Sequence, residues 1–128
     1  MIEFTLQGEP KSKGRPRFSK QGHAYTPKAT REAEVAVQLA WEVSGGQKLV
    51  GPVVLECVFY LGSKRRKDLD NCLKLVQDAL NKRAYDDDDQ ITDIVARKVF
   101  TSPDRARSEV RIYQKMEVPY ERWETVAE

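Results

Sequence analysis

The stretch KRRKDLDN, residues 64–71, sets four cations directly before two aspartates. A cluster of cations indicates an anionic partner, whereas the carboxylates of Asp68 and Asp70 repel the same partner. A carboxylate at a helix N-terminus accepts hydrogen bonds from free backbone N–H groups, and Asp70 is a candidate for that role. Because one cap needs one aspartate, Asp68 is then either solvated charge or a ligand of a cation that lies between the carboxylates and the anion.

A second acidic run, DDDD at residues 86–89, follows the helix that we expect after this stretch. Such a run is ordinarily a solvated loop. If the helix packs back on the sheet, however, the strand that follows brings one of these carboxylates near Asp68 and Asp70. Three or four convergent carboxylates repel one another unless a hard divalent cation lies between them, and Mg²⁺ prefers oxygen ligands. The two acidic segments together therefore indicate a Mg²⁺ site.

Other metal chemistries fit the sequence less well. A calcium loop that begins at D-x-D-N needs glycine and glutamate where this chain has Leu73 and Ala79. Zinc is disfavoured because His23 is the single histidine, and because Cys57 and Cys72 lie in apolar patterns. We expect both cysteines to be reduced core residues. A single histidine also excludes sites that depend on two histidines.

Lys74 lies four residues after Asp70, on the polar face of the expected helix. One interpretation is an ordinary helix ion pair worth ~0.3 kcal/mol. The other is a lysine that orients a water or stabilises negative charge developing on a phosphate. Asp78 continues the same polar face, and we expect it to have a supporting structural role.

The first 31 residues carry seven cations against two glutamates, a balance of +5 in a chain whose net charge is +2. Glycine and proline keep KSKGRPR, residues 11–17, in a loop that can lie along phosphates. Arginines make bidentate phosphate contacts and lysines looser ones. The expected DNA-binding residues belong to this loop and to the first cation cluster: Lys11, Lys13, Arg15, Arg17, Lys64, Arg65, Arg66 and Lys67. Phe18 and Tyr25 are candidates for stacking or for core anchoring.

The composition indicates one globular domain, because 128 residues with 40% hydrophobic and 33% charged content can bury a core unaided. No apolar run approaches the ~20 residues that cross a membrane. The N-terminal MIEFTLQG alternates like a strand and does not resemble a signal peptide. We therefore expect a cytoplasmic protein with no membrane partner.

The elements that must position these residues follow from periodicity and turn signals. In chain order we expect a strand over 2–7, a basic loop, a helix over 28–44, a strand over 52–62, a helix over 70–83, and strands over 90–100 and 108–116. The turn at residues 102–104 predicts that the last two strands form an antiparallel hairpin. This β-α-β-α-β-β order predicts a single-domain α/β (α+β) fold, with two main helices packed on a mixed sheet. We expect the domain to cover residues 1–116 and to leave 117–128 as a mobile C-terminal tail.

The segment RRKDLDNCLKLVQDAL followed by YDDDDQI resembles the RusA family of Holliday-junction resolvases. The family signature is a basic-flanked D-L-D-N, a lysine four residues after its second aspartate, D-A-L, and then D-D-x-Q-[IV]. The loop GEPKSKGRPR also looks like the basic loop of many members. The resemblance spans residues 5–115 and joins two separated segments in register.

The resemblance implies a RusA-like fold and a metal site. Its ligands would be Asp68, Asp70 and Asp88, with Asp87 or Asp89 as alternatives to the third. Mg²⁺ is the implied cofactor, and Mn²⁺ is expected to substitute for it.

The resemblance also implies a substrate and an assembly. Lys74 matches the essential lysine of the family. The family works as homodimers whose paired sites nick opposed strands of a four-way junction, and a symmetric junction presents two equivalent phosphates to such a dimer.

Two other functions remain open on the residues alone. One is a non-catalytic DNA-binding module in which the acidic segments only cap helices and shape the surface. The other is a Mg²⁺ nuclease that acts on flaps or RNA. The sequence also leaves the dimer surface open between the first helix and residues 118–123.

Overall fold

The computed structural model describes residues 1–14 and 17–115. Its elements are β1 (Ile2–Gln7), β2 (Arg17–Phe18), β3 (Ala24–Tyr25), α1 (Lys28–Val43), β4 (Val53–Leu61), α2 (Leu69–Leu80), β5 (Ile91–Phe100) and β6 (Arg107–Gln114), with 3₁₀ turns η1 (Asp88–Gln90) and η2 (Pro103–Arg105). The expected α+β fold, with two helices and a mixed sheet, is confirmed. The tail expected from residue 117 lies outside the described residues.

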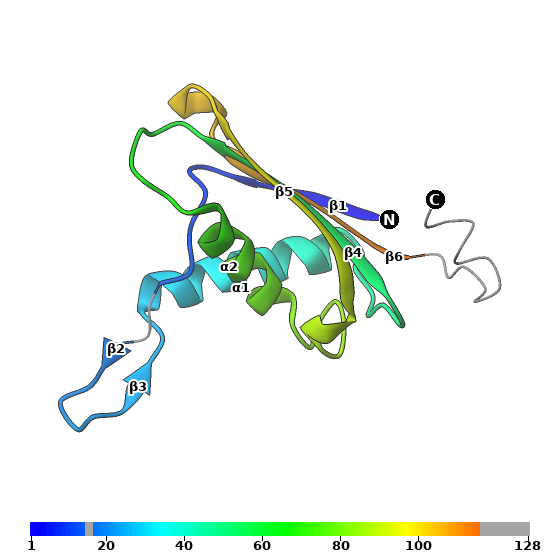
Figure 1. Ribbon diagram of the computed structural model, residues 1–128, viewed down its shortest axis with the longest axis horizontal. Helices are drawn as coiled ribbons and strands as arrows, with labels where there is room; N and C mark the ends of the chain where they lie inside the picture. Colours follow the sequence, from blue (N-terminus) through cyan, green and yellow to red (C-terminus); the bar gives the residue numbers. More distant parts are fainter. Residues whose placement is uncertain (15–16, 116–128) are drawn as a thin grey trace, which may run out of the picture.

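The main sheet has four strands in the order β1-β6-β4-β5. Strand β4 runs parallel to β5 and antiparallel to β6, and β6 pairs antiparallel with β1. Both helices cover the same face of this sheet (Figure 1). Strand β4 is buried along most of its length because it lies in the middle of the sheet under the helices.

The expected hairpin between the last two strands is wrong. Strand β4 lies between β5 and β6, so the connection that contains η2 passes over the end of β4. Val53–Leu61 is apolar almost throughout and is a central strand, with its helix-covered face buried and Glu56, Val58 and Tyr60 partly exposed on the other face. A turn signal at Pro103 marks a change of direction, but it does not say whether the two flanking strands pair with each other.

Helix α2 forms because its apolar residues recur every three or four positions. Cys72, Leu75, Val76, Ala79 and Leu80 are all buried, and they join a core that includes one face of β4. The helix ends at Leu80 rather than at residue 83. The backbone is already extended at Asn81, so the chain leaves the helix there.

The direction of α2 decides where its flanking residues lie. The helix connects two parallel strands, so it must run back along the sheet from the end of β4 to the start of β5. The β4–β5 register pairs Val53 with Ile91 and Leu61 with Phe100. The start of α2 therefore lies at the sheet end where β4 finishes, and η1 lies at the opposite end, before β5.

A short hairpin interrupts the segment that the sequence predicts as a continuous basic loop. Strands β2 and β3 pair Arg17 with Tyr25 and Phe18 with Ala24. The turn between them uses Gly22 in the left-handed region, at φ +81°. This hairpin stands away from the helices and the sheet in Figure 1.

Two expectations from composition can be compared with the structure. Cys57 and Cys72 are both free and buried, as expected, and burial raises the pKa of the Cys57 thiol to about 12. Across the part of the chain that the structure describes, neither helix has the length and apolar character that a membrane crossing requires.

Candidate active site

Asp68 and Asp70 lie at the exposed N-terminus of α2. The N-cap is Asp68 rather than Asp70, and its side chain makes no capping hydrogen bond. The Asp68 carboxylate is 53% exposed, with Arg66 Nε 3.7 Å from its Oδ1. Asp70 is exposed in the first helical turn. The N-cap position therefore belongs to Asp68 and not to Asp70, the candidate from the sequence, and both carboxylates are exposed.

The four cations before Asp68 divide into two kinds. Lys64, Arg65 and Arg66 are exposed. Lys67 is partly buried, and its ammonium donates a hydrogen bond to the carbonyl oxygen of Pro10. Three cations of the cluster can thus meet an anion, while the fourth fastens the loop before α2 to the N-terminal segment.

Lys98 is a cation of this region that the sequence analysis missed. Its Nζ donates to the carbonyl oxygen of Lys67 at 2.7 Å, so β5 holds the same loop from the other side. The β4–β5 register pairs Lys98 with Phe59, whose ring is in the core, so both side chains are on the helix-covered face. Nothing in the local sequence around Lys98 indicates this contact, because it depends on the strand pairing.

The acidic run at residues 86–89 forms an ordered turn rather than a plain solvated loop. Asp87 caps η1, accepting the backbone N–H of Asp89 at 3.0 Å. The amide of Gln90 accepts the N–H of Asp86 at 2.8 Å through its oxygen and donates to the carbonyl oxygen of Leu49 through its nitrogen. The Gln90 side chain is thus a structural clamp between the acidic turn and the segment before β4.

Asp88 is the carboxylate of this turn with a raised pKa. A hydrogen bond with the Asp87 side chain is the main cause; burial and the negative charges of Asp87 and Asp78 add to it, while Lys74 opposes it. Lys74 itself lies 3.4 Å from Asp78 and is 60% exposed. The η1 turn therefore gathers more negative charge than its neighbouring cations neutralise.

The expected convergence of the two acidic segments does not occur within one chain. Asp68 and Asp70 lie where β4 ends, whereas Asp88 precedes the start of β5 (Figure 1). Within residues 1–14 and 17–115, no three His, Cys, Asp or Glu side chains are grouped so that they could hold a metal ion. The reason is the parallel crossover, which keeps the length of α2 between the two segments.

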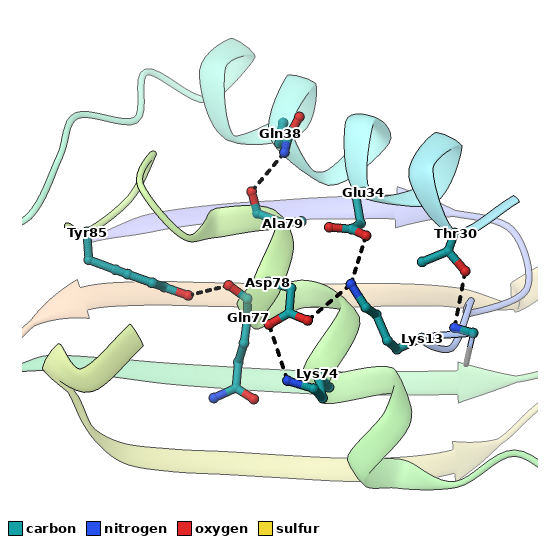
Figure 2. A network of polar contacts seen from close by, with 10 residues as sticks. Lys13, Thr30, Glu34, Gln38, Lys74, Gln77, Asp78, Ala79 and Tyr85 are labelled. Carbon is teal, nitrogen blue, oxygen red and sulfur yellow. Dashed lines mark hydrogen bonds and ion pairs between the residues drawn. The ribbon is translucent and has the colours of Figure 1, made fainter. Parts of the chain in front are cut away.

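Lys13 is placed differently from the phosphate contact that its sequence context predicts. Figure 2 shows its ammonium between the two helices, 3.0 Å from Glu34 Oε1 and 3.1 Å from Asp78 Oδ2. Burial opposes the charge of Lys13, yet hydrogen bonds and attraction from both carboxylates raise its pKa overall. Its side chain is 22% exposed, so Lys13 fastens the basic loop to α1 and α2.

Two backbone contacts hold the same loop beside the first aspartates. The N–H of Lys13 donates to the carbonyl oxygen of Asn71 at 2.9 Å, and the N–H of Gly14 donates to Thr30 Oγ1 at 3.1 Å. A Cβ at Gly14 would come within 2.7 Å of that hydroxyl, so the close approach requires glycine. Lys11 and Arg17 are exposed on either side of this anchor. Arg15 lies outside the described residues.

Comparison with known proteins adds a family to this geometry. The model of the family described as Endodeoxyribonuclease RusA matches residues 7–113. The chain is also 29% identical over 135 residues to the "Uncharacterized protein YqaN" of Bacillus subtilis (strain 168), covering 86% of this chain and 95% of that protein. The matched range includes both acidic segments, Lys74 and the hairpin.

Proposed function

Because this chain belongs to the RusA family of endodeoxyribonucleases, we propose that it is a Mg²⁺-dependent enzyme that resolves four-way DNA junctions, and that a homodimer makes the paired nicks. The observation that carries the proposal is the pair Asp68 and Asp70, exposed and without a capping hydrogen bond from Asp68, beside exposed cations. Carboxylates held next to phosphate-binding cations need a metal between them and the DNA. Membership of a nuclease family also argues against the purely DNA-binding module.

The donor chemistry fits a hard divalent cation, because all the candidate ligands are carboxylate oxygens. Asp68 and Asp70 would hold Mg²⁺ together with Asp88 from a second subunit, since Asp88 of the same chain lies beyond the other end of α2. Mn²⁺ accepts the same ligands. When bound, the ion supplies Lewis-acid stabilisation of the charge that develops on the scissile phosphate and makes water more acidic.

The remaining charged groups position the DNA. Lys64, Arg65 and Arg66 project from the loop directly before Asp68, where they would bind phosphates on both sides of the cut. Lys11 and Arg17 extend this basic surface from the N-terminal loop. Lys74 is exposed enough for its ammonium to approach a phosphate and stabilise negative charge there.

We place the second subunit on the edge of β5 that pairs with no strand among residues 1–14 and 17–115. Strand β5 is the last strand of the sheet, and Ile94 and Val95 are each 44% exposed along it. An exposed apolar strand edge readily pairs with another chain. Antiparallel pairing of two β5 strands would set the start of one beside the end of the other. Asp88 of the second subunit would then approach the sheet end where Asp68 and Asp70 lie.

Charge complementarity suggests a register for this pairing. Asp93 and Arg97 are four residues apart and lie on one face of β5. A twofold axis at Val95 would place Asp93 opposite Arg97 of the second subunit, and the symmetry makes this pair twice. Asp93 is 45% exposed while paired with Lys115 of its own chain at 2.8 Å, so one side of its carboxylate can meet a second cation.

Other surfaces compete with β5 for the dimer contact. Helix α1 exposes the apolar row Val35, Leu39 and Val43, so the first helix stays a candidate. Residues 118–123, the other candidate from the sequence, lie outside the described residues. The β5 edge is favoured because pairing there explains how separated carboxylates come to share one metal.

The first experiment tests the reaction. The protein is incubated with a synthetic four-way junction, a flap and a linear duplex of matched sequence, in Mg²⁺ and in Mn²⁺. We expect paired nicks in the junction and none with Asp70→Asn. Cleavage that survives this substitution would contradict the site, and equal cleavage of all three DNAs would contradict junction selectivity.

The second experiment tests the shared site by mixing two inactive variants. In a heterodimer of Asp70→Asn and Asp88→Asn, one site receives both substitutions and the other receives none. The mixture should therefore regain cleavage, with nicks at one strand instead of paired nicks. A mixture of Asp68→Asn and Asp70→Asn is the matched control. It should stay inactive, because Asp68 and Asp70 come from the same subunit and each site of the heterodimer therefore carries one of the two substitutions. If the first mixture also stays inactive, the site is not shared between subunits.

The third experiment tests the β5 surface by charge reversal. Asp93→Arg should convert the dimer into a monomer in light scattering, because two arginines would then face each other. Adding Arg97→Asp to the same chain should restore the dimer. Lys115→Met removes the internal partner of Asp93 and should leave the dimer intact. A dimer that persists in Asp93→Arg would move the contact to another surface such as α1.

A further inference from the structure

The β2–β3 hairpin is an ordered arm. The N–H of Ser19 donates to the carbonyl oxygen of His23 at 2.8 Å, and the N–H of His23 donates to Ser19 Oγ at 3.2 Å. Gly22 closes the tip by donating its N–H to the carbonyl oxygen of Ser19 at 2.9 Å. An isolated two-stranded hairpin is only marginally stable in water, so a projecting one gains most from a ligand that covers it.

The arm is rooted beside the proposed active site. Strand β2 begins four residues after Lys13. The N–H of Lys13 donates a hydrogen bond to the carbonyl oxygen of Asn71, the residue after Asp70. From there the arm extends away from the helices (Figure 1). DNA held at the Asp68–Asp70 end of α2 would therefore pass close to the arm.

The charge of the arm selects an anionic ligand. Residues 10–31 contain no aspartate or glutamate. Arg17 on β2 and Lys20 in the turn are both exposed, and so is His23. Such a segment attracts a phosphate backbone and is repelled by a basic protein surface.

The exposed ring of Phe18 indicates that the ligand offers an unstacked base as well as phosphates. Its side chain is 71% exposed, and the residue opposite it is Ala24, which is too small to cover a ring. A phenyl ring has no hydrogen-bonding group, so it cannot read the polar edges of base pairs in a groove. Its strongest interaction with DNA is stacking on the face of a base. Bases offer such a face where the regular stack is interrupted.

We propose that the β2–β3 arm binds the branch of the junction, with Phe18 stacked on a base exposed where the duplex arms separate and with Arg17 and Lys20 on the flanking phosphates. The proposal rests on the proposed function and adds a residue that selects branched over linear DNA. Tyr25, 49% exposed, pairs with Arg17 on the hairpin face opposite Phe18, so its ring does not share the stacking contact.

The experiment measures binding without cleavage, in full-length protein carrying Asp70→Asn. Dissociation constants are measured by fluorescence anisotropy for a fixed four-way junction and for a linear duplex, at several salt concentrations. We expect Phe18→Ala to weaken junction binding about tenfold, which is the loss in affinity expected when one base–aromatic stack is removed, and to leave duplex binding unchanged. Phe18→Tyr keeps an aromatic face and should retain the selectivity, whereas Phe18→Leu, which is apolar but not aromatic, should lose it.

A phosphate contact behaves differently and serves as the internal control. Arg17→Gln should weaken the binding of both DNAs to a similar degree and reduce the slope of affinity against salt by about 1. Light scattering on each variant shows whether the dimer is retained.

Three results would overturn the proposal that the β2–β3 arm binds the branch of the junction. In the first, Phe18→Ala leaves the junction-to-duplex ratio unchanged; in the second, Phe18→Leu binds the junction as well as Phe18→Tyr does. In the third, the Phe18 variants lose the dimer, which would make the arm a contact between subunits. A protein that binds no DNA in any of these assays overturns the proposed function as well, so the two failures are distinguishable.

Discussion

The two ends of α2 carry the same residue type in opposite situations. Asp78, near the C-terminal end, has Lys13 3.1 Å from one oxygen and Lys74 3.4 Å from the other, and its side chain is 24% exposed. At the N-terminal end, Asp68 is 53% exposed with one cation at 3.7 Å, and Asp70 is exposed. A partnered, half-buried carboxylate holds elements together, whereas an exposed one is available to a ligand.

The contrast extends to the cations. Lys13 and Lys67 occur in basic stretches that suggest DNA contact, yet both bond to groups of their own chain. Lys11 and Arg66 occur in the same two stretches and are exposed. Each basic segment therefore contains residues that anchor the loop and residues that remain for the DNA. The following predictions test this division.

The largest expected effect separates the two aspartates of α2. Asp70→Asn should reduce cleavage at least about 100-fold, because losing a metal ligand costs more than losing a group that merely orients one, and should leave the melting temperature nearly unchanged. Asp78→Asn should do the reverse, lowering stability while Mg²⁺-saturated cleavage persists. Single-turnover cleavage and thermal unfolding of both variants measure this. Similar losses of activity in the two variants would remove the distinction.

Lys13→Met tests the anchoring cation. It leaves Glu34 and Asp78 half-buried without their shared partner, so the free energy of unfolding should fall by about 1–3 kcal/mol. Urea unfolding measures the loss. Lys11→Met is the matched control, since it removes an exposed lysine two positions away and should weaken DNA binding without changing stability. Equal stability of the two variants would show that the Lys13 network contributes little.

Arg66→Gln tests an exposed cation. Its ion pair with Asp68 is long and solvated, so the change in stability should stay within about 0.5 kcal/mol. Junction affinity should fall, and the slope of affinity against salt should decrease by about 1. Arg83→Gln removes a comparable exposed pair with Glu42 beyond the other end of α2 and should not affect DNA binding. A similar salt slope in both variants would contradict a phosphate contact at Arg66.

The smallest expected effect is that of Asp88→Asn on the pH dependence of the free energy of unfolding, measured without metal. The raised pKa of Asp88 means that the folded protein keeps a proton that the unfolded chain loses above the ordinary value of 3.8. The contribution of this group to stability therefore falls as pH rises through that window. Asn removes the fall, so in EDTA the variant should gain stability relative to the natural protein as the pH rises above the ordinary value of 3.8. A wild-type-like pH profile would contradict the interpretation.

Local periodicity was enough to predict most elements. Val53–Leu61 is a strand because its residues are β-branched, aromatic and apolar, and α2 is a helix because its buried residues recur at helical spacing. The motif residues around Asp68 and the segment ending at Gln90 were also sufficient to suggest the family. These signals are readable because each depends on neighbours within a few positions along the chain.

Only the tertiary structure decided which residues meet. The place of β4 between β5 and β6, the burial of Lys13 between two helices, and the separation of Asp88 from Asp70 all depend on contacts far apart in sequence. Residue type does not distinguish Lys13 from Lys11, because both lie in the same basic loop and only packing gives one of them partners. The sequence determined which groups are capable of the chemistry, and the direction of α2 decided that one chain does not unite them.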